Sequence, residues 1–174
     1  SGNYRTDLFP DFPYLCAPQK ATTMEDYRKM AEANQRRGRE IIAETQLVES
    51  WEAIGAQANL IGSLSTGLMM KKLDIDMHVY TDTLSIKESF RAAARIASHP
   101  GIVRMEYTNL IDTEEECIEW HAAYRDRDGR MWKMDMIHIR RGSAYDGFAE
   151  RMASRIGAVL TEETRDAILR LKYE

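Results

Sequence analysis

The chain has 174 residues, of which 44% are hydrophobic and 30% are charged, as is typical of a single globular domain. Its formal net charge is −4, which disfavours a general nucleic-acid binder because such proteins are usually basic. No run of 18 apolar residues and no signal peptide is visible, so the sequence predicts no membrane span and we expect a cytoplasmic protein.

The first 21 residues differ in composition from the rest of the chain. They contain three of the four prolines together with several aromatic side chains: Phe9, Pro10, Phe12, Pro13, Tyr14 and Pro18. We expect an extended arm over 1–21 and a single domain over 22–174. The aromatic residues would pack on the body or contact a partner chain, which leaves a homodimer open. Cys16 and Cys117 form neither a disulfide framework nor a metal-binding spacing.

A first helix is expected to begin at Thr22, because Glu25 follows at the spacing of a capping box. The helical period of apolar residues continues to Val48. The basic segment 35–39 is either a solvated helix face or a cationic patch for a nucleotide or acceptor. Residues 50–58 would extend or repeat the helix, and 59–62 would form a short buried strand.

The segment 73–80 alternates between apolar and polar residues. Its apolar positions are Leu73, Ile75, Met77 and Val79, and its polar positions are Asp74, Asp76, His78 and Tyr80. In a strand, this pattern places the apolar side chains on the core face and both carboxylates on the opposite face. Neighbouring like charges require a counter-charge or open water. Mg²⁺ is one such counter-charge, because it prefers carboxylate oxygens.

Gly62 and Ser63 precede this strand by ten intervening residues. Glycine allows a backbone to approach a ligand closely. The segment Thr66–Lys71 is expected to form a short helix whose free N–H groups face a phosphate.

The second half is expected to contain a helix, three strands and two further helices. A helix is expected from Ser85, with Glu88 in capping-box spacing, followed by a strand over 101–109 and a hairpin of 117–124 and 130–139 turned by Asp126–Gly129. Two further helices are expected over 143–156 and 161–173. Asp135 lies among apolar neighbours of the second hairpin strand, so it requires a metal or a structural salt bridge to arginine or lysine.

Gly-Ser, ten residues and then Asp-x-Asp before an apolar strand resembles the nucleotidyltransferase signature of the DNA polymerase β superfamily, in which Gly67 also matches a recurring loop glycine. The resemblance implies an α+β domain with a mixed sheet and flanking helices. Its core would lie at about 50–140, with an extra N-terminal helix and a C-terminal helix pair at 143–173.

The resemblance further implies transfer of a nucleoside monophosphate from a nucleoside triphosphate, most simply ATP, to a hydroxyl group. Asp74, Asp76 and Asp135 would hold two Mg²⁺ ions, with Mn²⁺ as an alternative. The phosphate-binding residues would be drawn from the preceding turn and loop: Gly62, Ser63, Thr66, Gly67, Lys71 and Lys72. Each of the two lysines is alternatively a solvated loop residue.

The acceptor is open between a small molecule and a partner protein, and the acidic balance disfavours a long RNA. The segment from Arg125 to His138 is loosely similar to lincosamide and aminoglycoside nucleotidyltransferases, with the histidine three residues after Asp135. His78 would line the acceptor side or simply end its strand, and the histidines, His121 included, lack a zinc-binding helix motif. The alternative function is an inactive, antitoxin-like module of the same fold that binds a nucleotide or a partner. In a further alternative, Asp74 and Asp76 only face solvent.

Overall fold

A computed structural model describes residues 22–174, so the predictions made for the arm, Cys16 included, lie outside the described residues. A mixed sheet of five strands has the order β1-β2-β5-β4-β3, with β2 and β5 parallel and every other pair antiparallel. The strands are β1 Gln57–Ile61, β2 Asp74–Thr81, β3 Ile102–Leu110, β4 Cys117–Arg125 and β5 Met131–Arg140. The helices are α1 Met24–Glu44, α2 Leu47–Glu52, α3 Gly62–Thr66, α4 Ile86–Ala97, α5 Phe148–Val159 and α6 Glu162–Tyr173.

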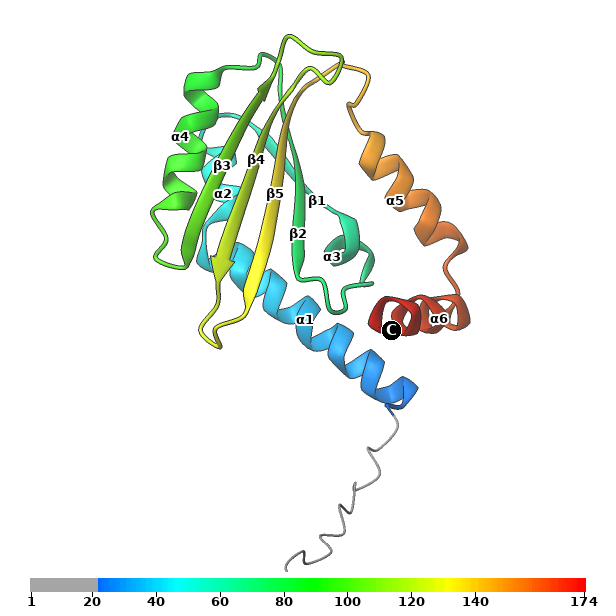
Figure 1. Cartoon of the computed structure of the whole chain (residues 1–174). Helices are drawn as coiled ribbons and strands as arrows, with labels where there is room; N and C mark the ends of the chain where they lie inside the picture. The colour runs from blue at the N-terminus through cyan, green and yellow to red at the C-terminus, as the bar shows by residue number, and fades with distance from the viewer. Residues whose placement is uncertain (1–21) are drawn as a thin grey trace, which may run out of the picture.

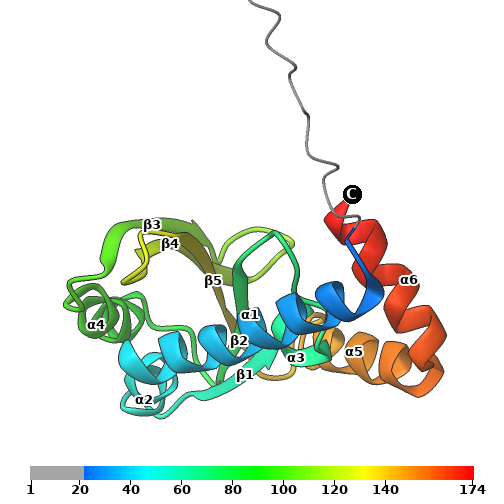
Figure 2. The same ribbon diagram turned by 90° about the horizontal axis from the view of Figure 1, so that it is seen from below.

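The main core lies between one face of the sheet and the helices α1, α2 and α4 (Figures 1 and 2). Ile75, Met77 and Val79 on β2 are at most 1% exposed, as their alternation predicts. Trp51 and Trp132, also fully buried, fill this core from α2 and β5. The hydrophobic effect therefore fixes which face of β2 turns inward, and the aspartates are left on the other face.

Helix α1 spans the molecule, with its first turns against α6 and its last turns against α2 (Figure 2). A second cluster of buried apolar residues joins α1 to α6: Tyr27, Ala31, Leu68, Met70 and Leu169. This packing holds the C-terminal helix against the loop that follows α3. No helix within residues 22–174 is long and apolar enough to cross a membrane.

Several expected boundaries are wrong by one to five residues. The first helix is capped by Thr23 and Asp26, which form the reciprocal capping box one residue later than expected. Strand β1 is half-buried rather than buried, because it is an edge strand. Helix α5 begins after Gly147, whose φ is 66°, and not at Ser143, because the preceding residues form turns.

The basic segment 35–39 is neither a wholly solvated face nor an open cationic patch. The Arg37 side chain is 6% exposed, and its guanidinium donates to Glu44 at 2.7 Å and to Glu40 at 3.1 Å. Gly38 faces Leu64 and the Trp132 ring, where a side chain would crowd the core. The Arg37 pairs lie within α1, and the close packing at Gly38 holds the middle of this helix against the body.

Candidate active site

Helix α3 begins at the Gly-Ser pair itself, four residues before the predicted helix at Thr66–Lys71. Gly62 has φ 69°, and a Cβ at this position would overlap the Asp76 carboxylate. Gly67 has φ 75° and ends the helix in the left-handed conformation that favours glycine. The expected helix is wrong because Gly67 terminates it, and the chain continues to β2 as a loop.

Asp76 and Asp135 are direct register partners on the parallel strands β2 and β5, and Asp74 is paired with Lys133 two positions earlier. All three aspartates are half-buried on the face of the sheet opposite the core. Neighbouring strands lie about 4.8 Å apart, so the fold brings the three predicted carboxylates to one place beside the start of α3.

The electrostatics of this cluster favour an added positive charge. Burial first, and then the negative charges of Asp135 and Asp74, raise the pKa of Asp76 to about 6. Lys133 and Lys172 act in the opposite direction without cancelling this effect. A set of hard carboxylate oxygens that destabilise one another fits a divalent cation such as Mg²⁺.

Asp135 also has protein partners. Its Oδ1 is 2.6 Å from Nδ1 of His121, and its Oδ2 is 2.7 Å from Nζ of Lys133. The lysine pair is the structural salt bridge considered as an alternative for Asp135. Because the Lys133 side chain is 57% exposed, solvent screens this pair and its contribution to stability is small. The hydrogen bond to Asp135 raises the pKa of His121. The Nε2 atom of His121 lies 3.3 Å from the Glu119 carboxylate.

The three aspartates do not already form a closed cage. Within residues 22–174, the one group of three potential ligands whose atoms all lie within 4.8 Å of one another is Glu115, Cys117 and Glu119. Asp135 instead turns to His121 and Lys133, which take the place of a cation for that carboxylate. A metal ion would therefore have to compete with these two partners.

The cation that contacts the Gly-Ser pair is Lys172 of α6, whose Nζ donates to Ser63 Oγ at 2.6 Å. Of the two predicted lysines, Lys71 lies over the Tyr173 ring at 4.1 Å, and Lys72 is exposed in the loop. Lys172 was missed because it is 109 residues from Ser63 in sequence, and no motif marks it. Only the docking of α6 against α1 makes it a site residue.

Hydrogen bonds from neighbouring side chains hold the rest of the α3 backbone in place. Thr66 Oγ1 donates to the Gly62 carbonyl at 3.1 Å, so this hydroxyl closes the short helix. Arg165 donates to the carbonyls of Gly67 at 2.9 Å and Thr66 at 3.2 Å, and Gln35 donates to the Ser63 carbonyl at 3.0 Å. These contacts fix the position of the predicted phosphate-binding turn.

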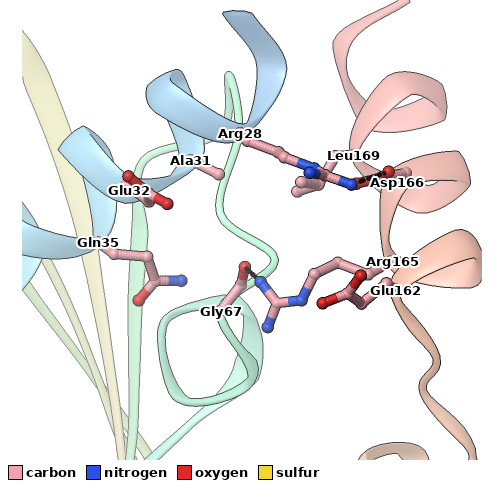
Figure 3. Close-up of a pocket in the computed structure, with 9 residues that line it drawn as sticks. All are labelled: Arg28, Ala31, Glu32, Gln35, Gly67, Glu162, Arg165, Asp166 and Leu169. Carbon is pink, nitrogen blue, oxygen red and sulfur yellow. Dashed lines mark hydrogen bonds and ion pairs between the residues drawn. The ribbon is translucent and has the colours of Figure 1, made fainter. Parts of the chain in front are cut away.

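Arg165 and Gln35 line a cavity of about 400 Å³ between α1, α6 and the end of α3 (Figure 3). On its far side Arg28 pairs with Asp166, which joins α1 to α6. Gly67 is the one predicted site residue in its lining, and the three aspartates are elsewhere. We therefore assign this cavity to the packing behind α3 and not to the carboxylate site.

His138, which the similarity to antibiotic nucleotidyltransferases singles out, lies on the wrong face of the sheet for that role. It is fully buried between Thr81 Oγ1, at 2.7 Å from its Nε2, and Ser89 Oγ, at 3.1 Å from its Nδ1. Burial lowers its pKa to about 4. Side chains alternate between the two faces along a strand, and His138 lies an odd number of residues, three, after Asp135. The two side chains therefore point to opposite faces of the sheet.

Solved nucleotidyltransferase structures match this fold over most of the chain. A structure of Cid1, described by its RNA terminal uridylyl transferase activity, is 16% identical with a TM-score of 0.58, and covers 86% of this chain and 47% of its own. The GLD-2/RNP-8 complex is 9% identical with a TM-score of 0.59, with 86% and 52% covered. The noncanonical poly(A) polymerase complex GLD-2–GLD-3 is 9% identical with a TM-score of 0.56, with 82% and 46% covered.

No family model matches the sequence, and no curated protein matches it significantly. The chain spans about half the length of the solved structures it resembles. At these identities the likeness concerns the fold. The chain has the mixed sheet and flanking helices of a polymerase-β-like nucleotidyltransferase catalytic domain.

Proposed function

We propose that the chain transfers a nucleoside monophosphate from a nucleoside triphosphate, most simply ATP, to a hydroxyl group of a small molecule or partner protein. The observation that carries the proposal is the register of Asp76 with Asp135 beside a Gly-Ser turn that has no room for a side chain at Gly62. A turn of this shape lets a phosphate approach the carboxylate cluster. Cid1 structures are described as bound to MgGTP and to MgATP.

Asp74, Asp76 and Asp135 would hold two Mg²⁺ ions, or Mn²⁺ in their place. Bound there, the ions would supply the positive charge that stabilises the entering and leaving oxygens of an in-line displacement. A bond forms between the acceptor oxygen and the α-phosphorus, the bond from that phosphorus to the β-phosphate oxygen breaks, and pyrophosphate leaves.

The chain's own residues have separate tasks in this proposal. The Ser63 hydroxyl and the backbone at Gly62 bind the terminal phosphates, and the ammonium group of Lys172 neutralises part of their charge. Lys172 is already held at this place by its 2.6 Å contact with Ser63 Oγ. Asp135 accepts the proton of the acceptor hydroxyl, and His121, at 2.6 Å, orients that carboxylate.

A second candidate is a nucleotide-binding or interaction module without catalysis. The observation that favours it is the ion pair of Asp135 with Lys133 at 2.7 Å, which gives this carboxylate a purpose without a metal. The two candidates differ in a measurable way, because only the enzyme consumes triphosphate when Mg²⁺ is added.

The test is thermal melting of the wild type and Asp76→Asn with each of the four nucleoside triphosphates, with and without Mg²⁺. A ligand at about 100 times its dissociation constant stabilises the native state by about 2.7 kcal/mol. We expect a Mg²⁺-dependent rise in the wild type that is lost in the variant, while Asp112→Asn, an exposed carboxylate, keeps it. No rise with any triphosphate refutes the nucleotide site. A rise without pyrophosphate release across a panel of hydroxyl acceptors favours the binding module.

A further inference from the structure

A second cavity, of about 270 Å³, opens on the same face of the sheet as the carboxylates. It is lined by His78, Glu115, Cys117, Glu119, Ile137, Ile139 and Tyr145. Its position follows from three successive cross-strand rows of side chains. The first row is Asp76, Asp135 and His121, the second is His78, Ile137 and Glu119, and the third is Tyr80, Ile139 and Cys117. The cavity therefore begins one row beyond the proposed catalytic carboxylates.

The lining combines an apolar floor with a negative wall. Ile137, Ile139 and the 41% exposed Tyr145 supply apolar surface. The Glu115 carboxylate is exposed and makes no hydrogen bond or ion pair with a described residue, whereas Glu119 contacts His121. Within residues 22–174, no lysine or arginine lines the cavity. Arg140, the nearby cation at the end of β5, is paired with Glu116.

Neighbouring groups add to the negative potential. Glu150 of α5 accepts hydrogen bonds from Tyr80 and Asn59, both at 2.9 Å, which hold it next to His78. A polyanion would meet repulsion from all of these carboxylates.

One group inside the cavity lacks a partner. Cys117 is 5% exposed, is a free thiol and makes no hydrogen bond with a described residue. Burial first and the two glutamates second raise the pKa of this thiol to about 11, so it is protonated at neutral pH when no ligand is bound. An organic ligand needs no thiolate and would cover the sulfur with apolar or polar surface.

We propose that this cavity binds the acceptor, and that the acceptor is a small cationic compound with a hydroxyl group and an ammonium group about 8 Å apart. This inference rests on the proposed function, because that function requires the acceptor hydroxyl to point toward Asp135. The distance follows from the positions of Asp135 and Glu119 in the sheet. Glu119 is one row, or about 7 Å, further along the strand direction, and it lies on the neighbouring strand, about 4.8 Å to the side. The ammonium group lies against Glu119 and Glu115, the linker on Ile137 and Ile139, and the hydroxyl beside Asp135.

A cavity of about 450 Å³ on the other side of the carboxylates has a different character. It is lined by Asp74, His121, Lys133 and Arg104 among others, and Arg104 lies 3.5 Å from Glu106. Its mixed charges suit phosphate groups better than the acidic cavity does. None of Gly62, Ser63 and Lys172 lines this cavity of mixed charge, so the proposed triphosphate site lies elsewhere, and the acidic cavity is the one of the two that suits a cation.

Three probes of one length and different charge test the inference: 6-aminohexan-1-ol, hexane-1,6-diol and 6-hydroxyhexanoate. Each is titrated by NMR, without nucleotide, into the full chain with labelled isoleucine methyl groups, at about 0.15 M salt, where charges beyond about 8 Å are screened. We expect the amine to bind about tenfold more tightly than the carboxylate, with the diol between them, and to shift Ile137 and Ile139.

The double variant Glu115→Gln/Glu119→Gln should lose this preference. Glu115→Gln alone, at an exposed position, gives the same direction of change if the double variant folds poorly. Glu114→Gln removes the same charge from an exposed neighbour outside the cavity and should keep the preference. Equal affinity for the three probes overturns the inference. So does tighter binding of single-stranded hexauridylate to the same residues, which would indicate a nucleic-acid acceptor.

The melting experiment with Mg²⁺ and triphosphates is run on the same protein samples. Nucleotide stabilisation without a preference for the amine rejects the acceptor inference and leaves the proposed function standing. A preference for the amine without nucleotide stabilisation rejects the proposed function.

Discussion

The buried histidine of β5 makes the stability of the fold depend on pH. The pKa of His138 falls from 6.5 to about 4 on folding, because burial disfavours the charged ring. Between these two values the unfolded chain binds the proton and the folded chain does not, so the stability is present above pH 6.5 and is lost as the pH falls. The full shift corresponds to about 3 kcal/mol, of which about 2 kcal/mol is lost by pH 5.

Urea unfolding of the wild type and His138→Gln, at about pH 7.5 and about pH 5, measures this contribution. The variant is expected to be less stable at the higher pH, because glutamine fills the site less well, but to lose about 2 kcal/mol less than the wild type on acidification. Comparing the two proteins cancels the other titrating groups, including Asp76 and His121, whose raised pKa values act in the opposite sense.

Ser89→Ala is the matched control, because it removes a hydrogen-bond partner of both His138 and Trp120 while keeping the imidazole. It should lower stability and keep the wild-type dependence on pH. An identical loss in the wild type and His138→Gln would refute the placement of this ring in the core and reopen a role for it in the site.

Three further substitutions test the site and its support. Gly62→Ala should lower stability by about 1–3 kcal/mol and abolish nucleotide-induced stabilisation, because the new Cβ meets Asp76 at a positive φ; retained nucleotide binding in a melting assay would contradict this geometry. Lys172→Met should weaken triphosphate binding about tenfold or more, whereas Lys71→Met should have a small effect in the same titration; the reverse order would return the role to the loop. Arg37→Met should cost about 1–2 kcal/mol in urea unfolding, because it removes the hydrogen bonds of a buried guanidinium to Glu44, whose 39% exposed side chain is then solvated; an unchanged stability would mean that water fully replaces the guanidinium.

The alternating strand was predictable because its period is local. Ile75, Met77 and Val79 occupy the core as their spacing predicts, and the Gly-Ser spacing identified the fold that the solved structures share. The placement of Asp135 beside Asp76 also followed from a pattern, a carboxylate in an apolar strand, together with the resemblance. The first of these inferences needed only neighbouring residues and one rule of side-chain direction, whereas the other two also needed the resemblance.

The errors arose where tertiary contacts decide the outcome. The Arg37 cluster has the composition of a solvated face, and only the fold brings Asp126 of the β4–β5 hairpin within 4.0 Å of its guanidinium. His121 and His138 are equivalent by composition, yet pairing in the sheet sends one to Asp135 and the other to Ser89. Helix α3 began earlier than expected because Gly67 adopts a left-handed conformation, a choice that the sequence allows at either glycine.

The most consequential residue that the sequence did not reveal belongs to the C-terminal helix. Leu169 of α6 is 1% exposed and packs in the cluster that includes Tyr27 and Ala31 of α1, and Tyr173 contacts the Tyr27 ring. That packing fixes the position of α6 against α1 and places Lys172 in contact with Ser63. Helix α1 also carries Gln35, which donates to the Ser63 carbonyl. A single helix therefore positions both Gln35 and, through its packing on α6, Lys172 beside the Gly-Ser turn. The long first helix and the last helix are therefore parts of the proposed nucleotide site, although neither contributes a carboxylate to it.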